Sequence, residues 1–486
     1  MVSNIVCGLV AGLMMAGVVS GQEATVAGSR AGATQPAGGV ASSQPAWKAA
    51  ADARIEQHRK GDFELRLVLA GGEGGAAEAV AGAEVRIEQT GHGFLFGTCI
   101  NALATGRGEA SEKYRAFVLR HFNCVVLEND MKWYSIEKRP GVLTFDAADA
   151  QLAFAEKHGL AVRGHCLLWD VEKWVHGWVR ELEVEALREA VFAQIERTAR
   201  RYAGRVFCWD VSNEMLDGGF YAGRLGAAVN AEVFKAAAKA DPGAVLFVNE
   251  YSILADEAKT ERYIKLVEGL RAAGAPVGGI GIQEHGCERF VVRLDAEGKP
   301  IAHHKHPSGT PEAMFASLER MASLGLPIHL TEISANSLDD GIRAEALDIL
   351  FRVGFSHPQV EAILLWGFWE RAHWLGKNAS LVDAQFEPNA AGRHLTHLLE
   401  HEWRTRSRVR SDEAGRVRFR GFYGTYAVHV TLADGRTGSA NVRLDRKARS
   451  ATVRLELAGG QSGTGEPGEP VAPVAPDSPM GPGVGR

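Results

Sequence analysis

Short apolar runs alternate with amphipathic stretches of helical period between residues 94 and 403. The eight runs span residues 94–100, 124–129, 161–169, 206–214, 245–251, 279–285, 327–333 and 362–370. Runs of this length between helical stretches are typical of buried parallel strands. One stretch, residues 185–204, places Leu187, Val191 and Ile195 at helical spacing and ends at Gly204. Eight strands alternating with helices predict an α/β fold, a (β/α)8 TIM barrel, with an open doubly wound sheet as the alternative.

Alternating apolar and polar positions flank this region on both sides. Residues 63–70 and 83–89 alternate around a glycine-rich segment and predict a β-hairpin. Residues 416–457 contain four more alternating stretches. We therefore expect small flanking β segments at both ends of the barrel. The expected boundaries are 47–93 for an N-terminal β extension, 94–404 for the barrel and 405–457 for a small C-terminal β domain.

The two ends of the chain differ in composition from the rest. Residues 5–20 are apolar without a charge and precede small residues, so we expect a signal peptide over 1–21, with a buried helix or a membrane anchor as alternatives. Residues 22–46 form a low-complexity linker, and residues 458–486 are rich in Gly and Pro and predicted to be disordered. This pattern predicts a secreted or periplasmic protein with no membrane contact after signal cleavage.

Composition excludes several classes of protein. With 46% hydrophobic and 23% charged residues among 486, wholesale disorder is excluded. The net charge of −5 gives no general attraction to nucleic acid or to anionic membranes. Six cysteines without a CxxC pair argue against a zinc site, and the five beyond the expected signal peptide lie in or beside apolar runs. We expect buried free thiols, no metal and no cofactor.

Polar and aromatic residues gather at the carboxyl ends of the predicted strands. Those at or just after a strand end are Glu128, Asn129, Lys132, His165, Trp169, Asn213, Glu214, Asn249, Tyr251, Gln283, His285, Glu332, Trp366 and Trp374. The carboxyl ends of the strands form the active-site face of a barrel. An unpaired buried polar group costs about 1–3 kcal/mol, so an accidental concentration at one end is disfavoured.

Two of these residues are carboxylates that end the fourth and seventh strands, Glu214 and Glu332. Glycoside hydrolysis requires such a pair, one protonated and one ionised, about 5–5.5 Å apart in a retaining enzyme. The tryptophans offer flat faces for stacking on sugar rings, and the amide, imidazole and amine groups suit hydroxyls. The predicted chemistry is carbohydrate cleavage at the mouth of a barrel.

The sequence resembles glycoside hydrolase family 10, the endo-β-1,4-xylanase family. The resemblance is carried by FGTCINA (96–102), FNCVVLENDMKW (122–133), RGHCLLW (163–169), WDVSNE (209–214), NEYS (249–252), GIGIQEH (279–285), LTE (330–332) and WGFWERAHW (366–374). It implies a retaining, endo-acting hydrolase of β-1,4-xylosidic bonds, with Glu214 as acid/base and Glu332 as nucleophile.

The resemblance also implies binding roles. Asn213 would bond the 2-hydroxyl of the sugar at the cleavage site, and Gln283 and His285 would lie around the nucleophile. His165 and Lys132 would hold the same sugar, and Glu128 and Asn129 the next one outward. The cleft would be walled by Trp169, Trp366 and Trp374. The implied partner is a polysaccharide, xylan or a related β-1,4-glycan, and the implied state is a monomer.

Three residues depart from the family pattern. Ser334 replaces the usual Asp that pairs with the histidine of the preceding strand, here His285. Asp170 and Glu172 replace the usual His and Gln after Trp169 and are expected to alter which sugar the outer subsites accept.

Other functions are also compatible with the sequence. A barrel that binds glycan without cleaving it, or a β-glycanase of different sugar specificity, would share most of these motifs. A metal-dependent barrel hydrolase is a further alternative, but His165 and His285 at the predicted strand ends do not lie in an HxH or HExxH motif. The histidine run at 303–306 is predicted to be an exposed loop.

Overall fold

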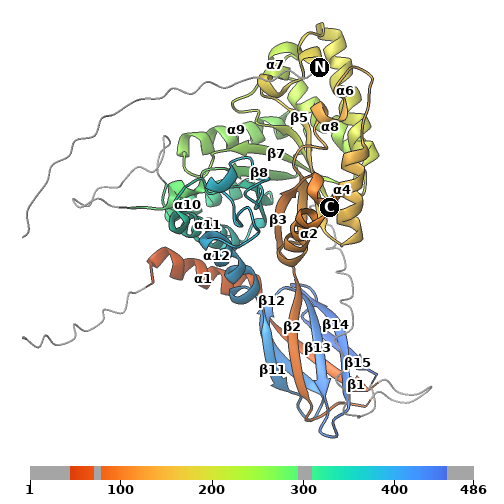
Figure 1. Cartoon of the computed structure of the whole chain (residues 1–486), viewed down its shortest axis with the longest axis vertical. Helices are drawn as coiled ribbons and strands as arrows, with labels where there is room; N and C mark the ends of the chain where they lie inside the picture. Colours follow the sequence, from red (N-terminus) through yellow and green to blue (C-terminus); the bar gives the residue numbers. More distant parts are fainter. Residues whose placement is uncertain (1–43, 70–77, 294–308, 457–486) are drawn as a thin grey trace, which may run out of the picture. The chain divides into compact units, whose positions relative to one another are not determined.

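The structure is a computed structural model that describes residues 44–69, 78–293 and 309–456 (Figure 1). Within these ranges the chain forms a closed barrel of eight parallel strands and two small sheets. The expected signal peptide and the expected C-terminal tail lie outside the described residues, as do all but the last residues of the expected linker.

The barrel strands follow one another in chain order. They are β3 (Leu95–Ile100), β4 (Cys124–Leu127), β5 (Ala161–Trp169), β6 (Cys208–Asn213), β7 (Val245–Tyr251), β8 (Gly279–Glu284), β9 (Ile328–Ile333) and β10 (Val360–Leu365). β10 pairs in parallel with β3, which closes the barrel. The predicted barrel is therefore confirmed, and the open doubly wound sheet is wrong.

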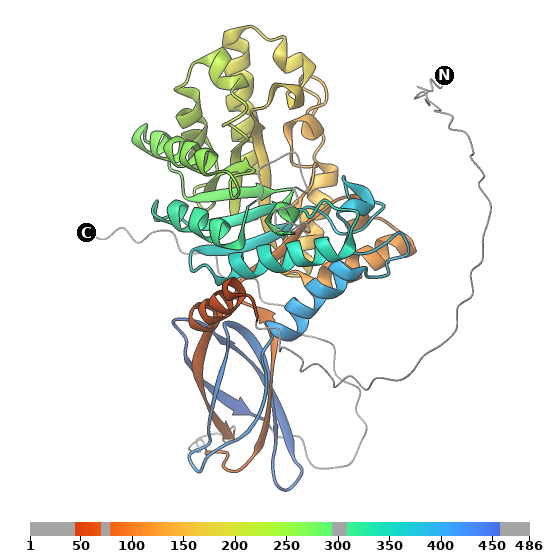
Figure 2. The same ribbon diagram turned by 90° about the vertical axis from the view of Figure 1, so that its left-hand side faces the viewer.

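Helices surround the barrel, as Figure 2 shows. The longer ones between the strands are α2 (Glu109–His121), α4 (Asp146–Lys157), α6 (Val184–Arg201), α8 (Val229–Ala240), α9 (Glu257–Ala272), α10 (Pro311–Ala322), α11 (Asp340–Ser356) and α12 (Ala390–His397). Shorter helices are α3 (Trp133–Ile136), α5 (Gly177–Arg180) and α7 (Phe220–Leu225). On α6, Leu187, Val191 and Ile195 are fully buried, as their spacing predicts.

The flanking segments form one β unit of two sheets. Its strands are β1 (Lys60–Leu69), β2 (Glu84–His92), β11 (Arg406–Arg410), β12 (Arg416–Phe422), β13 (Gly424–Thr431), β14 (Thr437–Leu444) and β15 (Ser450–Leu455). One sheet has the order β12-β1-β15 and the other β11-β2-β13-β14. The N-terminal strands thus pair with C-terminal strands, and the two expected flanking regions share one core.

The predicted hairpin is wrong, because β1 and β2 lie in different sheets. Both strands alternate as expected, but their apolar faces are buried against each other's sheet, with Leu65, Leu67, Val85 and Ile87 in a common core. Residues 47–59, expected to begin a β extension, belong instead to helix α1 (Ala46–Arg59). Alternation fixes the buried face of a strand but not the strand beside it.

The β unit meets the barrel core through a small number of large side chains. Phe422, at the end of β12, is buried and belongs to the barrel core, with its ring 6.0 Å from that of Phe355 and 5.5 Å from that of His92. Arg59 at the end of α1 is buried and donates to the carbonyls of Phe355 and Val360. Aromatic packing and a buried guanidinium thus fix the start of the β unit to the barrel.

The five cysteines in the described ranges, Cys99, Cys124, Cys166, Cys208 and Cys287, are all buried and free, so the thiol prediction is confirmed. Across residues 44–69, 78–293 and 309–456, none of the helices has the length and apolar character needed to cross a bilayer.

Candidate active site

The two predicted carboxylates come from the fourth and seventh strands of the barrel. Glu214 directly follows β6, and Glu332 is the fifth residue of β9. Glu214 has a φ of 63°, in the left-handed region, and its backbone N–H donates to the carbonyl of Asn249 at 2.9 Å. A left-handed non-glycine residue costs free energy and is found most often at functional sites.

Two amide side chains link the carboxylates. Asn249 Nδ2 donates to Glu332 Oε1 at 2.8 Å and to Asn213 Oδ1 at 2.8 Å. Asn213 Nδ2 in turn donates a hydrogen bond to Glu214 Oε1 at 3.2 Å. Gln283 Nε2 donates to Asn213 Oδ1 at 3.0 Å. One hydrogen-bond network therefore holds both carboxylates in fixed positions.

Glu332 is surrounded by nitrogen groups that favour its ionised form. It is only 5% exposed, with His285 Nε2 at 3.3 Å from Oε2 and His165 Nε2 at 3.8 Å from Oε1. Burial acts to raise the pKa of Glu332, but His165, His285 and Lys132 outweigh it, so its pKa lies below the ordinary value. Glu332 is thus an ionised carboxylate near neutral pH.

Glu214 has the opposite shift. Burial raises its pKa above the ordinary value, and the charge of Glu332 acts in the same direction. The indole N–H of Trp169 donates to Glu214 Oε2 at 2.9 Å and partly opposes this rise. A carboxyl group with a raised pKa therefore faces the same mouth as one with a lowered pKa, which is the direction of difference that acid-assisted glycoside cleavage needs.

His165 is held by a buried ion pair behind it. Its Nδ1 lies 2.9 Å from Asp210 Oδ2, and Asp210 also accepts from Arg163. Burial raises the pKa of Asp210, yet Arg163 and His165 bring it below the ordinary value. The ionised Asp210 fixes the ring so that Nε2 points toward Glu332.

The predicted residues that follow β4 include Lys132, which lies beside two of the predicted tryptophans. Lys132 Nζ lies 4.6 Å from the ring centre of Trp169 and 5.6 Å from that of Trp366, and it donates to Asn129 Oδ1 at 3.3 Å. Glu128 accepts from Asn101 at 3.4 Å, and burial raises its pKa. Amine, amide and carboxyl groups here form a polar surface beside the tryptophans.

The other predicted aromatic residues differ in burial and in the side chains that they contact. Trp366 is buried with its ring 5.1 Å from His165, whereas Trp374 is 56% exposed and meets His285 edge-on at 5.1 Å. Tyr251 is in contact with Lys259, whose Nζ is 3.7 Å from its ring centre, and with Asp217. Burial raises the pKa of Tyr251, and Glu214 contributes to that rise.

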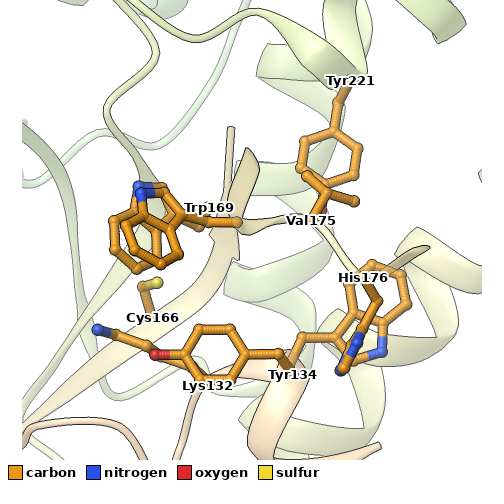
Figure 3. Close-up of a pocket in the computed structure, with 9 residues that line it drawn as sticks. Lys132, Tyr134, Cys166, Trp169, Val175, His176 and Tyr221 are labelled. Carbon is orange, nitrogen blue, oxygen red and sulfur yellow. The ribbon is translucent and has the colours of Figure 1, made fainter. Parts of the chain in front are cut away.

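A pocket of about 20 Å³ opens beside Trp169 (Figure 3). It is lined by Lys132, Trp133, Tyr134, Cys166, Trp169, Trp174, Val175, His176 and Tyr221. Figure 3 shows Trp169 and Cys166 at one end and His176 at the other. The pocket has room for about one water molecule and is therefore too small to hold a sugar ring.

The three departures have different surroundings. Ser334 Oγ lies 3.4 Å from His285 Nδ1, so the serine occupies the position beside the histidine. Asp170 is fully buried and accepts from the N–H of Tyr221 at the start of α7, and burial raises its pKa to about 6. Asp170 thus holds the backbone at the start of α7, and its expected effect on the sugar that is accepted stays a prediction. Glu172 is exposed on a short 3₁₀ turn, Glu172–Trp174.

Several residues of the site have no role predicted from sequence. Asn249 contacts Glu332 directly, Asp210 orients His165, and Trp174 stacks on Trp169 with ring centres 4.8 Å apart at 19°. Asp210 had a visible signal, since a charged residue inside an apolar strand must be paired. Trp174 had none, because it lies in a loop.

No group of three or more His, Cys, Asp or Glu side chains in the described ranges is placed to hold a metal ion. The histidine run at 303–306 lies outside those ranges.

The chain is similar in sequence to known proteins, among them a plant xylanase. Endo-1,4-beta-xylanase 1 of Arabidopsis thaliana is 33% identical over 409 residues, which are 84% of this chain and 40% of that protein. Anti-sigma-I factor RsgI6 of Acetivibrio thermocellus is 35% identical over 408 residues, 84% of this chain and 49% of that protein. This chain therefore spans less than half the length of these two relatives.

A solved structure agrees. Xylanase 10B of Thermotoga petrophila RKU-1, in complex with xylobiose, superposes with a TM-score of 0.56 and 28% identity, covering 64% of this chain and 95% of that one. The sequence model of glycosyl hydrolase family 10 matches residues 86–397, which contain the whole barrel and both carboxylates. The chain belongs to glycosyl hydrolase family 10.

Proposed function

We propose that this protein is a retaining, endo-acting glycoside hydrolase that cleaves β-1,4-xylosidic bonds in xylan through a covalent glycosyl-enzyme intermediate. The observation that carries the proposal is the pair of strand-end carboxylates with opposite pKa shifts in one hydrogen-bond network. A retaining mechanism needs one carboxyl group to give a proton and the other to attack carbon.

In the first step Glu332 attacks the anomeric carbon while Glu214 protonates the leaving oxygen. The carbon–oxygen bond to the leaving sugar breaks, and an ester bond to Glu332 forms. Glu214, now ionised, then takes a proton from water, whose oxygen attacks the same carbon and releases Glu332. Two inversions return the sugar to its original β configuration.

The surrounding residues support the binding steps. Asn213 Nδ2 can donate to the 2-hydroxyl of the reacting sugar, a bond that strengthens as positive charge develops on the ring. Lys132, His165, Gln283 and His285 can hold the same sugar. Glu128 and Asn129 can hold the next, and Trp169, Trp366 and Trp374 can wall the cleft.

The relatives support the substrate class. Three of those named as endo-1,4-beta-xylanases in Arabidopsis thaliana are 33–37% identical to this chain, and the related solved xylanase carries xylobiose. We propose a polysaccharide of the xylan type as the partner, a monomeric state, and action in a secreted or periplasmic location, the last resting on the apolar segment at residues 5–20.

The test is to follow products by proton NMR when purified protein meets linear xylan, branched arabinoxylan or mixed-linkage β-glucan. We expect xylo-oligosaccharides whose new reducing ends are initially β-anomers. Initial α-anomers would contradict the retaining mechanism, and release of xylose alone would contradict endo action. Cleavage of β-glucan in preference to xylan would assign a different sugar specificity.

One observation favours a second candidate function, binding of xylan without cleavage. Ser334 gives His285 a hydroxyl partner in place of a carboxylate, so less negative charge supports the group beside Glu332. In that case the NMR spectra would stay unchanged while the protein still binds xylo-oligosaccharide by calorimetry.

A further inference from the structure

A second cavity, of about 970 Å³, lies at the opposite end of the barrel from the two carboxylates. It is lined by the first residues of β3 and β5, by Phe207 just before β6, and by the turn that joins β14 to β15. Because Phe207 precedes β6 and Glu214 follows it, the two sites are separated by the length of that strand, about 20 Å. The cavity is therefore no part of the proposed active site.

The barrel side of this cavity contains an apolar patch. Leu95, Ala161 and Phe207 line it and are only partly buried, and the neighbouring Leu160 and Val206 complete the same surface. The ring of Phe207 lies 6.0 Å from that of the buried His329. A flat apolar group would remove this surface from water.

The β-unit side is cationic. Arg443 and Arg446 line it and are exposed; Arg443 lies 3.7 Å from Asp445, and Arg446 Nη2 donates to the carbonyl of His58 at 2.8 Å. The Arg446 guanidinium also lies 5.7 Å from the ring centre of Tyr423. These contacts orient the two side chains while leaving guanidinium donors for a ligand.

The other charged residues of the lining leave an excess of positive over negative side chains. Arg205 pairs with Glu156 at 2.6 Å, and Arg59 donates to backbone carbonyls. Glu361 also lines the cavity, where burial raises its pKa and the nearby charges of Arg59 and Arg446 partly oppose that rise. Over the whole lining, five Lys and Arg residues face three carboxylates. The field inside the cavity therefore favours a negative group.

We propose that this cavity binds a small amphipathic anion, an aromatic carboxylate, whose ring lies on Leu95, Ala161 and Phe207 and whose carboxylate pairs with Arg443 and Arg446. The volume is within the range of small-molecule sites, and a guanidinium matches a carboxylate with two parallel hydrogen bonds. A ligand held in this way would contact the barrel and the β unit at once.

The test is a calorimetric titration of the full chain with 2-naphthoate. We expect saturable binding with one ligand per chain. The double variant Arg443→Gln/Arg446→Gln should weaken it about tenfold, because two charge-assisted hydrogen bonds are lost. The matched control is Arg436→Gln, in the turn before β14, where the arginine pairs with Asp434 and does not line the cavity. It should bind like the parent protein.

Three results would overturn the proposal. They are no saturable binding at millimolar 2-naphthoate, equal binding of the neutral 2-naphthamide, and unchanged affinity in the double variant. Loss of xylohexaose binding in that variant, with no naphthoate binding in the parent, would assign a neutral glycan to the cavity instead. Xylan hydrolysis should be unchanged in the double variant, so the outcome does not depend on the proposed function.

Discussion

Glu214 and Glu332 are chemically identical side chains, and their neighbours alone shift their pKa values in opposite directions. Glu332 has two imidazoles within 4 Å, whereas Glu214 has an indole and an amide. The sequence predicts both residues, because each ends a buried strand of the barrel. It does not predict the direction of either pKa shift, since the groups responsible come from other strands.

Replacement of the proposed nucleophile gives the first prediction. Glu332→Ala should lower kcat/KM on xylan by roughly 10⁴-fold, equivalent to about 5.4 kcal/mol of lost transition-state stabilisation. Rates of reducing-end release measure this. With added azide and an aryl xyloside, any product should be the α-azide, because only one inversion remains. Glu196→Ala, on the outer face of α6, serves as the control and should be fully active.

The pH profile gives the second prediction. Activity should fall as the pH drops through the lowered pKa of Glu332, which must be ionised, and fall again as the pH rises through the raised pKa of Glu214, which must be protonated. Trp169→Phe removes the N–H bond that favours ionised Glu214, so the alkaline limb of kcat/KM should move to higher pH. A limb that stays in place or moves to lower pH would contradict the assignment.

Glu214→Ala gives a related, third prediction. The loss should be far greater on xylan than on aryl xylosides with activated leaving groups, because only the former need a proton from the enzyme. Parallel kinetics on the two substrates measure the difference. Equal losses on both would argue against Glu214 as the acid.

At the scale of elements, the loop after β5 shapes the site more than its sequence indicates. Trp174 is 44% exposed on a 3₁₀ turn and stacks on Trp169, whose N–H reaches Glu214. The stack links a surface loop to the proposed acid through one intervening ring. Asp170 and Glu172 mark a departure from the family pattern in this loop, but nothing in the sequence indicates that the indole of Trp174 lies on Trp169.

Trp174→Ala is the fourth prediction. Removing the stacked ring should let Trp169 move and lower kcat/KM on xylan roughly two- to tenfold, the range expected for one aromatic pair. Steady-state kinetics provide the measurement, and Trp174→Phe, which keeps a ring in place, should recover most of the loss. An unchanged kcat/KM in the alanine variant would show that the stack does not support the site.

At the scale of the whole molecule, the stability of the barrel is tied to the β unit through Phe422 and Arg59. Phe422 is distant in sequence from Phe355 and His92, yet all three rings pack together. The core of the barrel therefore continues into the end of β12, and the N-terminal and C-terminal segments depend on each other for their pairing.

Phe422→Ala is the fifth prediction. The cavity left at this junction should cost about 3 kcal/mol in the free energy of unfolding, measured by chemical denaturation. Leu338→Ala, at a side chain that is 72% exposed, should change it by less than about 0.5 kcal/mol. Equal effects of the two substitutions would show that Phe422 does not support the junction.

The sequence by itself determined the eight barrel strands, their order along the chain, and the two glutamates that lie at the ends of the fourth and seventh strands. These features follow from local patterns, because an apolar run between helical stretches specifies a buried strand, and parallel strands bring their carboxyl ends to one edge. The resemblance to family 10 adds to this pattern because its motifs lie at those same strand ends.

Only the tertiary structure decided which strands pair outside the barrel, how Asn249, Asp210 and Trp174 support the site, and that Asp170 binds the backbone of α7. Each of these depends on contacts between residues far apart in the chain. Alternation gives a strand its faces but no partner, and a polar residue in the sequence does not reveal which group will satisfy it after folding.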